Sequence, residues 1–276
     1  MSKKKLLVSK FHYIFEIPKD IVKERKLILT LAKSDFKTRF AGSYLGIVWA
    51  FIQPIVTIFV YWFVFEKGLR AGRMVDYPFV LWLMCGLVPW FYFSDALNGG
   101  TNALIEYSYL VKKVVFKISI LPFVKVLSNI FIHVFFIVFV VCLHLCYGYR
   151  PNLYWVQIFY YVFCTFVLVL GLSYLTSALV VFFRDLTQII SIILQIGMWA
   201  TPILWNAGQY SQKLDFVLKI NPVYYIVQGY RNTLLAGEWF WNDIYWTLYF
   251  WIAVIMIFFL GQSIFKKLRV HFADVL

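Results

Sequence analysis

The stretch Trp155–Phe183 reads WVQIFYYVFCTFVLVLGLSYLTSALVVFF and contains no charged residue. As a helix, it is longer than the about 20 residues needed to cross the roughly 30 Å hydrocarbon core of a bilayer. A transmembrane β-strand is only about 10 residues long and alternates polar with apolar side chains. This stretch is far longer and does not alternate. The stretch therefore predicts a membrane-spanning helix.

Five more stretches have the same apolar character: Ser43–Phe65, Tyr77–Leu97, Pro122–Tyr147, Leu186–Trp205 and Ile244–Phe265. With 62% hydrophobic residues and a mean hydropathy of +0.77, the chain cannot hide its apolar side chains in one soluble core. These side chains must face lipid or each other. We expect an all-α integral membrane protein with six transmembrane helices, in one domain over residues 43–265.

An amphipathic helix is expected over Asp20–Phe40, before the first span. Its apolar side consists of Ile21, Ile28, Ala32, Phe36 and Phe40, and lysines occupy much of the other side. A helix of this kind lies in the plane of the membrane interface, or packs on a cytoplasmic partner. Residues 1–42 are therefore expected to form a cytoplasmic N-terminal segment.

The distribution of positive charge predicts the orientation. Only 7 of the 26 lysines and arginines fall in the connections on one side of the predicted spans. Because positive residues collect on the cytoplasmic side, both termini are expected there, including the tail 266–276. The same bias accounts for the net charge of +13 without nucleic acid as a partner.

The cytoplasmic connection 98–121 is long enough to dock a partner subunit. Within it, residues 103–111 can form a short helix, with its apolar side chains on one face and an acid at the rim, which suits a groove on a partner. The alternative is a helix on the membrane surface, held by its lysines. The residues expected to couple the chain to that partner are Leu104, Glu106, Tyr107 and Val111.

The external connection 206–243 contains the stretch Ile220–Leu235, which is too apolar for a solvated loop. Asn221-Pro222 is a signal for a helix start. We expect a re-entrant or interfacial helical element, whose backbone is covered by protein.

No feature of the sequence predicts catalysis or a metal site. The chain has no Gly-Lys dipeptide and hence no Walker A phosphate loop, and its four histidines are scattered. Asp95 is the one acid within a predicted span, where it is either functional or placed near the interface as a helix cap. We expect no cofactor in this chain, and energy from a separate subunit that binds ATP and magnesium.

Two polar stripes follow the predicted spans at helical spacing. Trp49, Gln53, Thr57 and Tyr61 recur every four residues in the first span, and Gln188, Ser191, Gln195 and Trp199 share a face of the fifth. Such stripes either join helices by hydrogen bonds or line a wet path. Their aromatic rings favour a path, for which the candidates are Trp49, Gln53, Thr57, Tyr61, Gln195 and Trp199.

Four motifs occur in order along the chain: Asp35–Pro54 (DFKTRFAGSYLGIVWAFIQP), Phe183–Leu186 (FRDL), Thr201–Leu204 (TPIL) and Asn221–Arg231 (NPVYYIVQGYR). Together they resemble the permeases of ABC exporters for polysaccharides and teichoic acids, over nearly the whole chain. Tyr61–Phe65 and the end His271–Leu276 are most similar to wall teichoic acid permeases of the TarG type. Gly42–Gly46 is as similar to O-antigen permeases.

The resemblance implies a homodimer that works with two copies of an ABC ATPase in the bacterial cytoplasmic membrane. The implied cargo is wall teichoic acid on a polyprenyl diphosphate lipid, with O-antigen or capsular polysaccharide as the alternative. Lys37 and Arg39, at headgroup depth, are then expected either to capture the lipid diphosphate or to bind anionic lipid. A membrane-embedded transferase is a remote alternative, since it would need paired acids or clustered histidines near one membrane face. A permease driven by an ion gradient is another.

Overall fold

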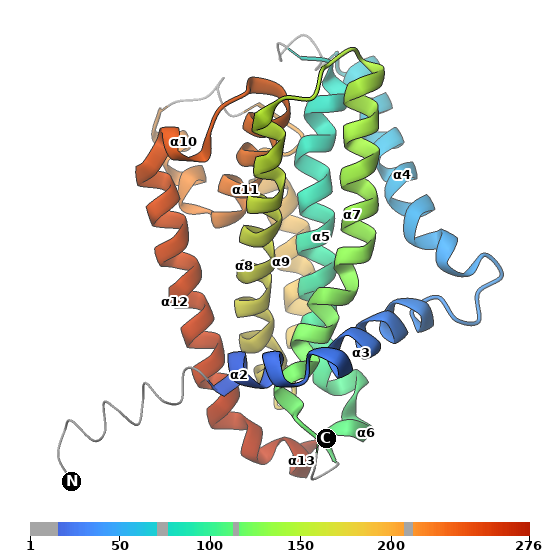
Figure 1. Ribbon diagram of the computed structural model, residues 1–276, viewed down its shortest axis with the longest axis vertical. Helices are drawn as coiled ribbons and strands as arrows, with labels where there is room; N and C mark the ends of the chain where they lie inside the picture. The colour runs from blue at the N-terminus through green and yellow to red at the C-terminus, as the bar shows by residue number, and fades with distance from the viewer. Residues whose placement is uncertain (1–15, 71–76, 113–115, 207–211) are drawn as a thin grey trace.

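The computed structural model describes residues 16–70, 77–112, 116–206 and 212–276, and every regular element within them is a helix (Figure 1). Within these described residues, five segments are long and apolar enough to cross a membrane, and they confirm five of the six expected spans. They are Gly46–Gly68, Phe79–Glu106, Ile118–Cys146, Leu153–Val180 and Phe240–Val275. Their main helices are α4 (Trp49–Trp62), α5 (Phe79–Glu106), α7 (Leu121–Cys146), α8 (Gln157–Val180) and α12 (Ile244–Leu268).

The stretch expected as the fifth span is shorter than predicted. Its helix α9 (Leu186–Ala200) has 15 residues, so it extends only about 22 Å. The helix ends because Thr201 precedes Pro202 and takes an extended conformation, with φ −85° and ψ 132°. The prediction of a full span over Leu186–Trp205 was therefore wrong in length.

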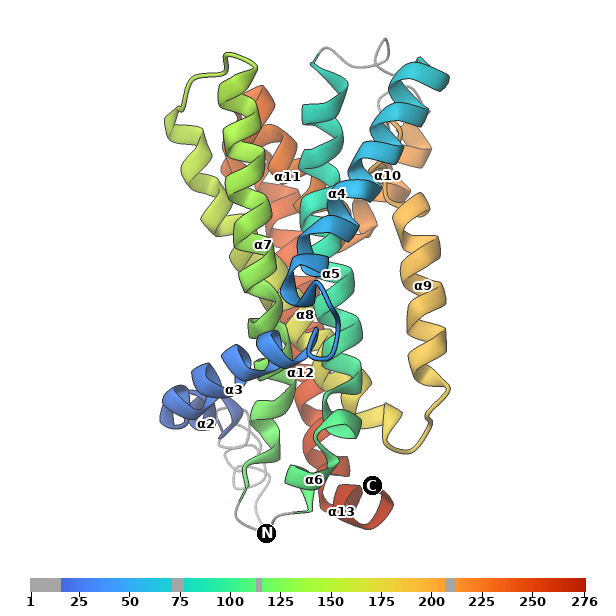
Figure 2. The same ribbon diagram turned by 90° about the vertical axis from the view of Figure 1, so that its right-hand side faces the viewer.

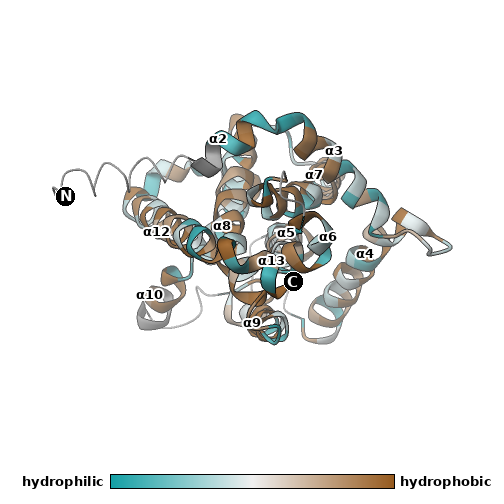
Figure 3. Ribbon diagram, turned by 90° about the horizontal axis from the view of Figure 1, so that it is seen from below, coloured by the Kyte–Doolittle hydropathy of each residue, from teal (hydrophilic) through white to brown (hydrophobic). Residues whose placement is uncertain are grey.

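Helix α5 forms the centre of the bundle, in contact with α7, α8 and the short helix α11 (Pro222–Arg231). Figures 2 and 3 show α4 and α9 at the periphery. Helices α8 and α12 pack closely because glycines meet: a Cβ at Gly261 would lie 2.3 Å from the carbonyl oxygen of Gly171. Small residues that let two backbones approach are the usual means of packing helices in a membrane.

We call the end of the bundle that carries α3 (Arg25–Thr38), α6 (Ser108–Val111) and α13 (Phe272–Val275) the basal end. The opposite end, with α10 (Gln212–Ile220) and α11, is the apical end (Figure 1).

At the apical end, the helix expected within Ile220–Leu235 is present as α11, and its re-entrant or interfacial position stays a prediction. Pro222 is its first residue, and the side chain of Asn221 accepts a hydrogen bond from the Val223 amide at 3.0 Å. This cap satisfies one of the free N–H groups at the helix start. Helix α11 packs on α5, α8 and α12, so its backbone is covered by protein as predicted.

Two of the sequence motifs contact each other at this end. The Asn221 amide donates to the Thr201 hydroxyl at 2.9 Å. Arg231 donates to the carbonyl oxygens of Pro202 and Ile203 at 2.8 and 3.0 Å, and stacks 3.6 Å above the ring of Trp82. The start and end of α11 thus hold the turn that ends α9.

At the basal end, α2 (Glu16–Lys23) and α3 cross the bundle roughly perpendicular to the long helices (Figure 1). The single helix expected over Asp20–Phe40 is interrupted at Glu24 and ends at Thr38. Its apolar side is confirmed, because Ile28 and Ala32 are buried against α7. The crossing direction suits a helix at the membrane interface, and that location stays a prediction.

Candidate substrate path

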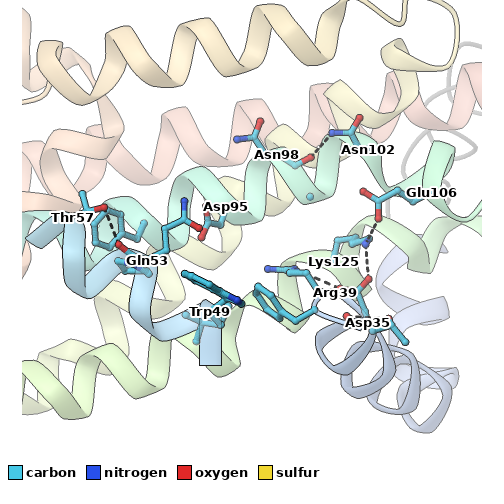
Figure 4. A pocket seen from close by; sticks show the side chains of 17 residues that line it. Asp35, Arg39, Trp49, Gln53, Thr57, Asp95, Asn98, Asn102, Glu106 and Lys125 are labelled. Atoms are coloured by element: carbon cyan, nitrogen blue, oxygen red, sulfur yellow. Dashed lines mark hydrogen bonds and ion pairs between the residues drawn. The ribbon is translucent and has the colours of Figure 1, made fainter. Parts of the chain in front are cut away.

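A cavity of about 650 Å³ lies in the basal half of the bundle, between α3, α4, α5 and α7 (Figure 4). Its volume falls within the about 300–1,000 Å³ typical of ligand pockets. Most of its lining is polar: Asp35, Thr38, Arg39, Gln53, Thr57, Asp95, Asn98, Asn102, Glu106 and Lys125. So many polar side chains among membrane helices must form hydrogen bonds, either with each other or with water or a polar ligand.

Helix α4 contributes three of its four stripe residues, Trp49, Gln53 and Thr57, to the cavity wall. The Thr57 hydroxyl donates to the backbone oxygen of Gln53 at 3.0 Å, so it is satisfied by its own helix. The Gln53 side chain is exposed and makes no hydrogen bond to any described residue. Its amide can therefore donate to and accept from a ligand.

The remaining predicted path residues lie outside the cavity. The Tyr61 hydroxyl is 4.0 Å from the sulfur of Met198, so it joins α4 to α9. Gln195 and Trp199 are exposed on α9 and do not line the cavity. The structure brings together the lower part of the first stripe but not the second, and the path role of all six residues stays a prediction.

Helix α5 supplies a polar stripe that the sequence reasoning missed as a set. At spacings of three and four residues, the cavity is lined by Asp95, Asn98, Asn102 and Glu106. Helix α9 binds the middle of this stripe, because Thr187 donates to the Asn102 side chain at 2.8 Å and Ser191 to that of Asn98 at 3.5 Å. The helical spacing of polar residues was the signal that could have found it.

A largely buried ionic junction lies at the basal end of the cavity. Lys125 of α7 donates to the carboxylates of Asp35 on α3 and Glu106 on α5. Asp35, which is 5% exposed, also accepts from Ser128 at 2.7 Å and from Tyr107 at 2.9 Å. A buried charge is tolerated only with such partners, so the junction fixes α3 to α5 and α7.

The junction shifts the proton affinities of its members. Burial raises the pKa of Asp35, but the charge of Lys125 and the hydrogen bonds from Lys125, Ser128 and Tyr107 outweigh it, so the pKa falls below its ordinary value. Burial and the adjoining Asp35 carboxylate raise the pKa of Tyr107. Asp35 therefore stays ionised at neutral pH and Tyr107 stays a donor.

Lys125 was not singled out from the sequence. The signal was present, because it is the one lysine inside an otherwise apolar span and Asn129 follows it by one helical turn. A lone cation in a membrane helix predicts a partner. That partner, Asp35, lies 90 residues away, and only the fold reveals it.

Of the two residues expected to capture a lipid diphosphate, the structure places only Arg39 at the cavity. Its guanidinium donates to the Asn129 side chain at 2.7 Å and lies 3.6 Å from the Asp35 carboxylate. Lys37 is exposed and does not line the cavity. Arg39 and Lys37 thus occupy different surfaces, and their role in capture stays a prediction.

The helix expected over 103–111 is split in the structure. Helix α5 runs on to Glu106, and α6 begins after a break at Tyr107, whose φ is −101° and ψ 26°. Leu104 and Val111 are buried in the core of the chain itself, so they do not form the exposed docking face that was expected. Of the four candidate coupling residues, Glu106 is half exposed and Tyr107 is partly exposed.

Comparison with known proteins is consistent with this architecture. The chain matches the model of the ABC-2 type transporter family over residues 26–235. It is 27% identical over 252 residues to the O-antigen export system permease protein RfbA of Klebsiella pneumoniae. The matched residues are 91% of this chain and 95% of the relative. It is also 27% identical over 263 residues to RfbA of Myxococcus xanthus, with 95% and 99% coverage. The chain therefore belongs to the ABC-2 type transporter family.

Proposed function

We propose that this chain is the permease of an ATP-driven exporter that moves a lipid-linked polysaccharide across the bacterial cytoplasmic membrane. ABC-2 permeases work with an ABC ATPase, which accounts for the lack of a phosphate loop in this sequence. The observation that carries the proposal is the polar cavity among membrane-spanning helices. Its amide side chains can bind hydroxyl groups at a depth where membrane helices usually carry apolar side chains.

An O-antigen-type polymer is the better-supported cargo. Both relatives described above are named for O-antigen export, and they align with more than nine-tenths of this chain. They favour O-antigen over wall teichoic acid, the cargo that Tyr61–Phe65 and His271–Leu276 predicted. Two asparagines and a glutamine in the cavity also suit the neutral hydroxyls of a sugar chain.

The charges of the cavity indicate where a lipid diphosphate would bind. Three carboxylates and two cations line it, and Lys125 is already bound to two of the carboxylates. A diphosphate deep in the cavity would meet net negative charge. Arg39, at the end of α3, is the better contact, because its guanidinium can bind two phosphate oxygens at once.

We place the basal end in the cytoplasm, with both termini. The positive-inside bias supports this orientation. The ATPase then binds near α6, where Glu106 and Tyr107 meet the surface and Tyr109 is 58% exposed. An aromatic side chain that enters a partner pocket is a common anchor of such contacts.

A second copy of the chain is expected to cover the faces of α4 and α9. Both helices expose large apolar side chains, among them Val56, Phe59, Ile193 and Ile196. Two copies joined here would place the α4 walls on either side of a shared path.

Transport in proteoliposomes tests the proposal. The permease and its ATPase would be reconstituted, and ATP-dependent appearance of a lipid-linked polysaccharide on the far leaflet would be followed with a lectin. We expect transport of the O-antigen-type polymer. No ATP-dependent transfer of either this polymer or lipid-linked teichoic acid would contradict the function, and transfer of teichoic acid alone would correct the cargo.

Substitution of Arg39 tests the phosphate contact. Loss of a charged hydrogen bond costs about 1.5–3 kcal/mol, so Arg39→Ala should raise the cargo concentration for half-maximal ATPase stimulation about tenfold or more. Lys37→Ala is the matched control, because Lys37 is exposed outside the cavity. Equal responses of the two variants would remove Arg39 from the site.

A further inference from the structure

A second cavity, of about 260 Å³, lies at the apical end between α11, the start of α12 and the short helix Phe240–Asp243. It shares no lining residue with the basal cavity. Its volume is just below the about 300 Å³ at which pockets for drug-sized ligands begin. It therefore has room for a group the size of one or two sugar rings.

One wall of this apical pocket is a chain of oriented polar side chains. Gln228 donates to the Asn232 oxygen at 2.9 Å, and Asn232 donates to a carboxylate oxygen of Glu238 at 3.1 Å. These bonds fix which atoms point where. They leave the Gln228 oxygen and the other Glu238 oxygen as acceptors for hydroxyl groups.

The short helix Phe240–Asp243 carries two further polar side chains of the lining. The side chains of Asn242 and Asp243 line the pocket, are exposed, and make no hydrogen bond to any described residue. An amide both donates and accepts, whereas a carboxylate accepts from hydroxyls. With Glu238 also present, the acids outnumber Lys219, so the pocket disfavours a phosphate or another anion.

Aromatic rings complete the lining. Tyr161, Tyr225, Trp239, Phe240 and Trp246 border the pocket, and Trp246 is half-buried. An aromatic face attracts polarised C–H groups, because its π-electrons carry negative charge. The Lys219 ammonium lies 5.4 Å from the ring centre of Trp246 and helps to hold that ring in place.

We infer that the apical pocket is a saccharide-binding subsite that holds sugar residues of the exported polymer on the outer face of the membrane. Aromatic rings with planar amides and carboxylates match the two kinds of surface that a sugar ring presents, its C–H faces and its hydroxyl edges. The identity of the polymer and the outer location rest on the proposed function. The ligand class rests on the pocket alone.

The subsite gives the emerging chain a contact that needs no lipid. A polymer that has left the basal cavity is bound through its sugars, so backward sliding is opposed without any contact to the lipid diphosphate. The pocket recognises one or two rings at a time, which allows the polymer to advance in steps.

The test uses the complete chain in lipid nanodiscs and the surface polysaccharide of the bacterium that encodes it, released from its lipid by mild acid. Saturation-transfer NMR would measure binding as the polysaccharide is titrated. We expect saturable binding, weakened about tenfold by Trp246→Ala and about threefold by Asn242→Ala. Because the probe carries no diphosphate lipid, it reports on the sugar contacts.

The chain offers matched controls for both variants. Tyr245 is 82% exposed next to Trp246 but does not line the pocket, and Asn152 is an exposed asparagine outside it. Tyr245→Ala and Asn152→Ala should bind as the unmodified protein does. Absence of saturable binding, or equal weakening by the pocket variants and the controls, would overturn the subsite. Binding without ATP-driven transport would support the subsite and contradict the exporter, whereas transport without binding would do the reverse.

Discussion

Helices α4 and α5 both line the basal cavity, but they are held very differently. In the most apolar window of each segment, 78% of residues are buried for Phe79–Glu106 and only 11% for Gly46–Gly68. Helix α5 packs on α7, α8 and α11, whereas α4 exposes apolar side chains such as Val56, Phe59 and Val60. The cavity thus has one wall fixed by the chain itself and one wall that faces lipid or a partner.

This difference separates stability from transport. Substitutions that disturb the packing of α5 on α7 and α8, or the junction around Lys125, should unfold or loosen the protein. Substitutions on α4 should leave the fold intact and change what passes along the cavity.

The largest effect is expected from Lys125→Met. It removes the close cation of the buried Asp35 carboxylate and leaves only the more distant Arg39, at 3.6 Å. Breaking a buried pair costs about 3–5 kcal/mol, and Arg39 offsets part of that cost. Helix α3 should detach from α7, which hydrogen exchange of α3 would detect. Adding Asp35→Asn should restore part of the protection. Lys112→Met is the control, since Lys112 is exposed, and equal exchange in both lysine variants would contradict the anchoring role.

A smaller effect is expected from Gly100→Ala on α5. The new Cβ would lie 2.1 Å from Oγ and 2.6 Å from Cβ of Ser173, so α5 and α8 must move apart at a cost of about 1–3 kcal/mol. Gly68→Ala, at the end of the α4 segment, meets nothing within 4 Å and should change stability by less than about 0.5 kcal/mol. Thermal unfolding in detergent compares them. Equal melting temperatures would show that α5 is no more fixed than α4.

The smallest effect is expected from pH. Because the pKa of Asp35 lies below its ordinary 3.8 in the folded protein, its stabilising charge is present above that value and lost only as pH falls through the lower one. Attachment of α3 should therefore be constant from pH 8 to pH 5. The protection of α3 against hydrogen exchange is compared with that of an unstructured chain at the same pH. If this protection falls between pH 8 and pH 5, and no longer falls in Asp35→Asn, the Asp35 carboxyl titrates higher than the account holds.

The sequence predicted the long helices well because an apolar run is a local signal. The start of α11 at Asn221-Pro222 was equally local and was confirmed. The length of α9 was missed, because the apolar run continues past Pro202 while the helix does not. There, the backbone restriction before proline outweighed hydropathy.

The candidate site was less predictable because it depends on contacts between distant segments. Helical spacing correctly placed Trp49, Gln53 and Thr57 on one wall. It did not reveal that Asp35 reaches Lys125, or that Leu104 turns into the bundle and leaves the surface. Periodicity shows which residues share a face, but only the fold shows what that face meets.

The most direct test of the central claim is thiol labelling of the two cavity walls. In a variant without the four native cysteines, Gln53→Cys on α4 and Asn98→Cys on α5 would be treated with a water-soluble thiol reagent in membranes. Phe59→Cys, on the exposed apolar side of α4, is the control. If the cavity is the substrate path, both cavity positions should react and lipid-linked polysaccharide should protect them, while position 59 stays unreactive. Labelling of the cavity positions that the cargo leaves unchanged, or equal labelling at position 59, would contradict the account.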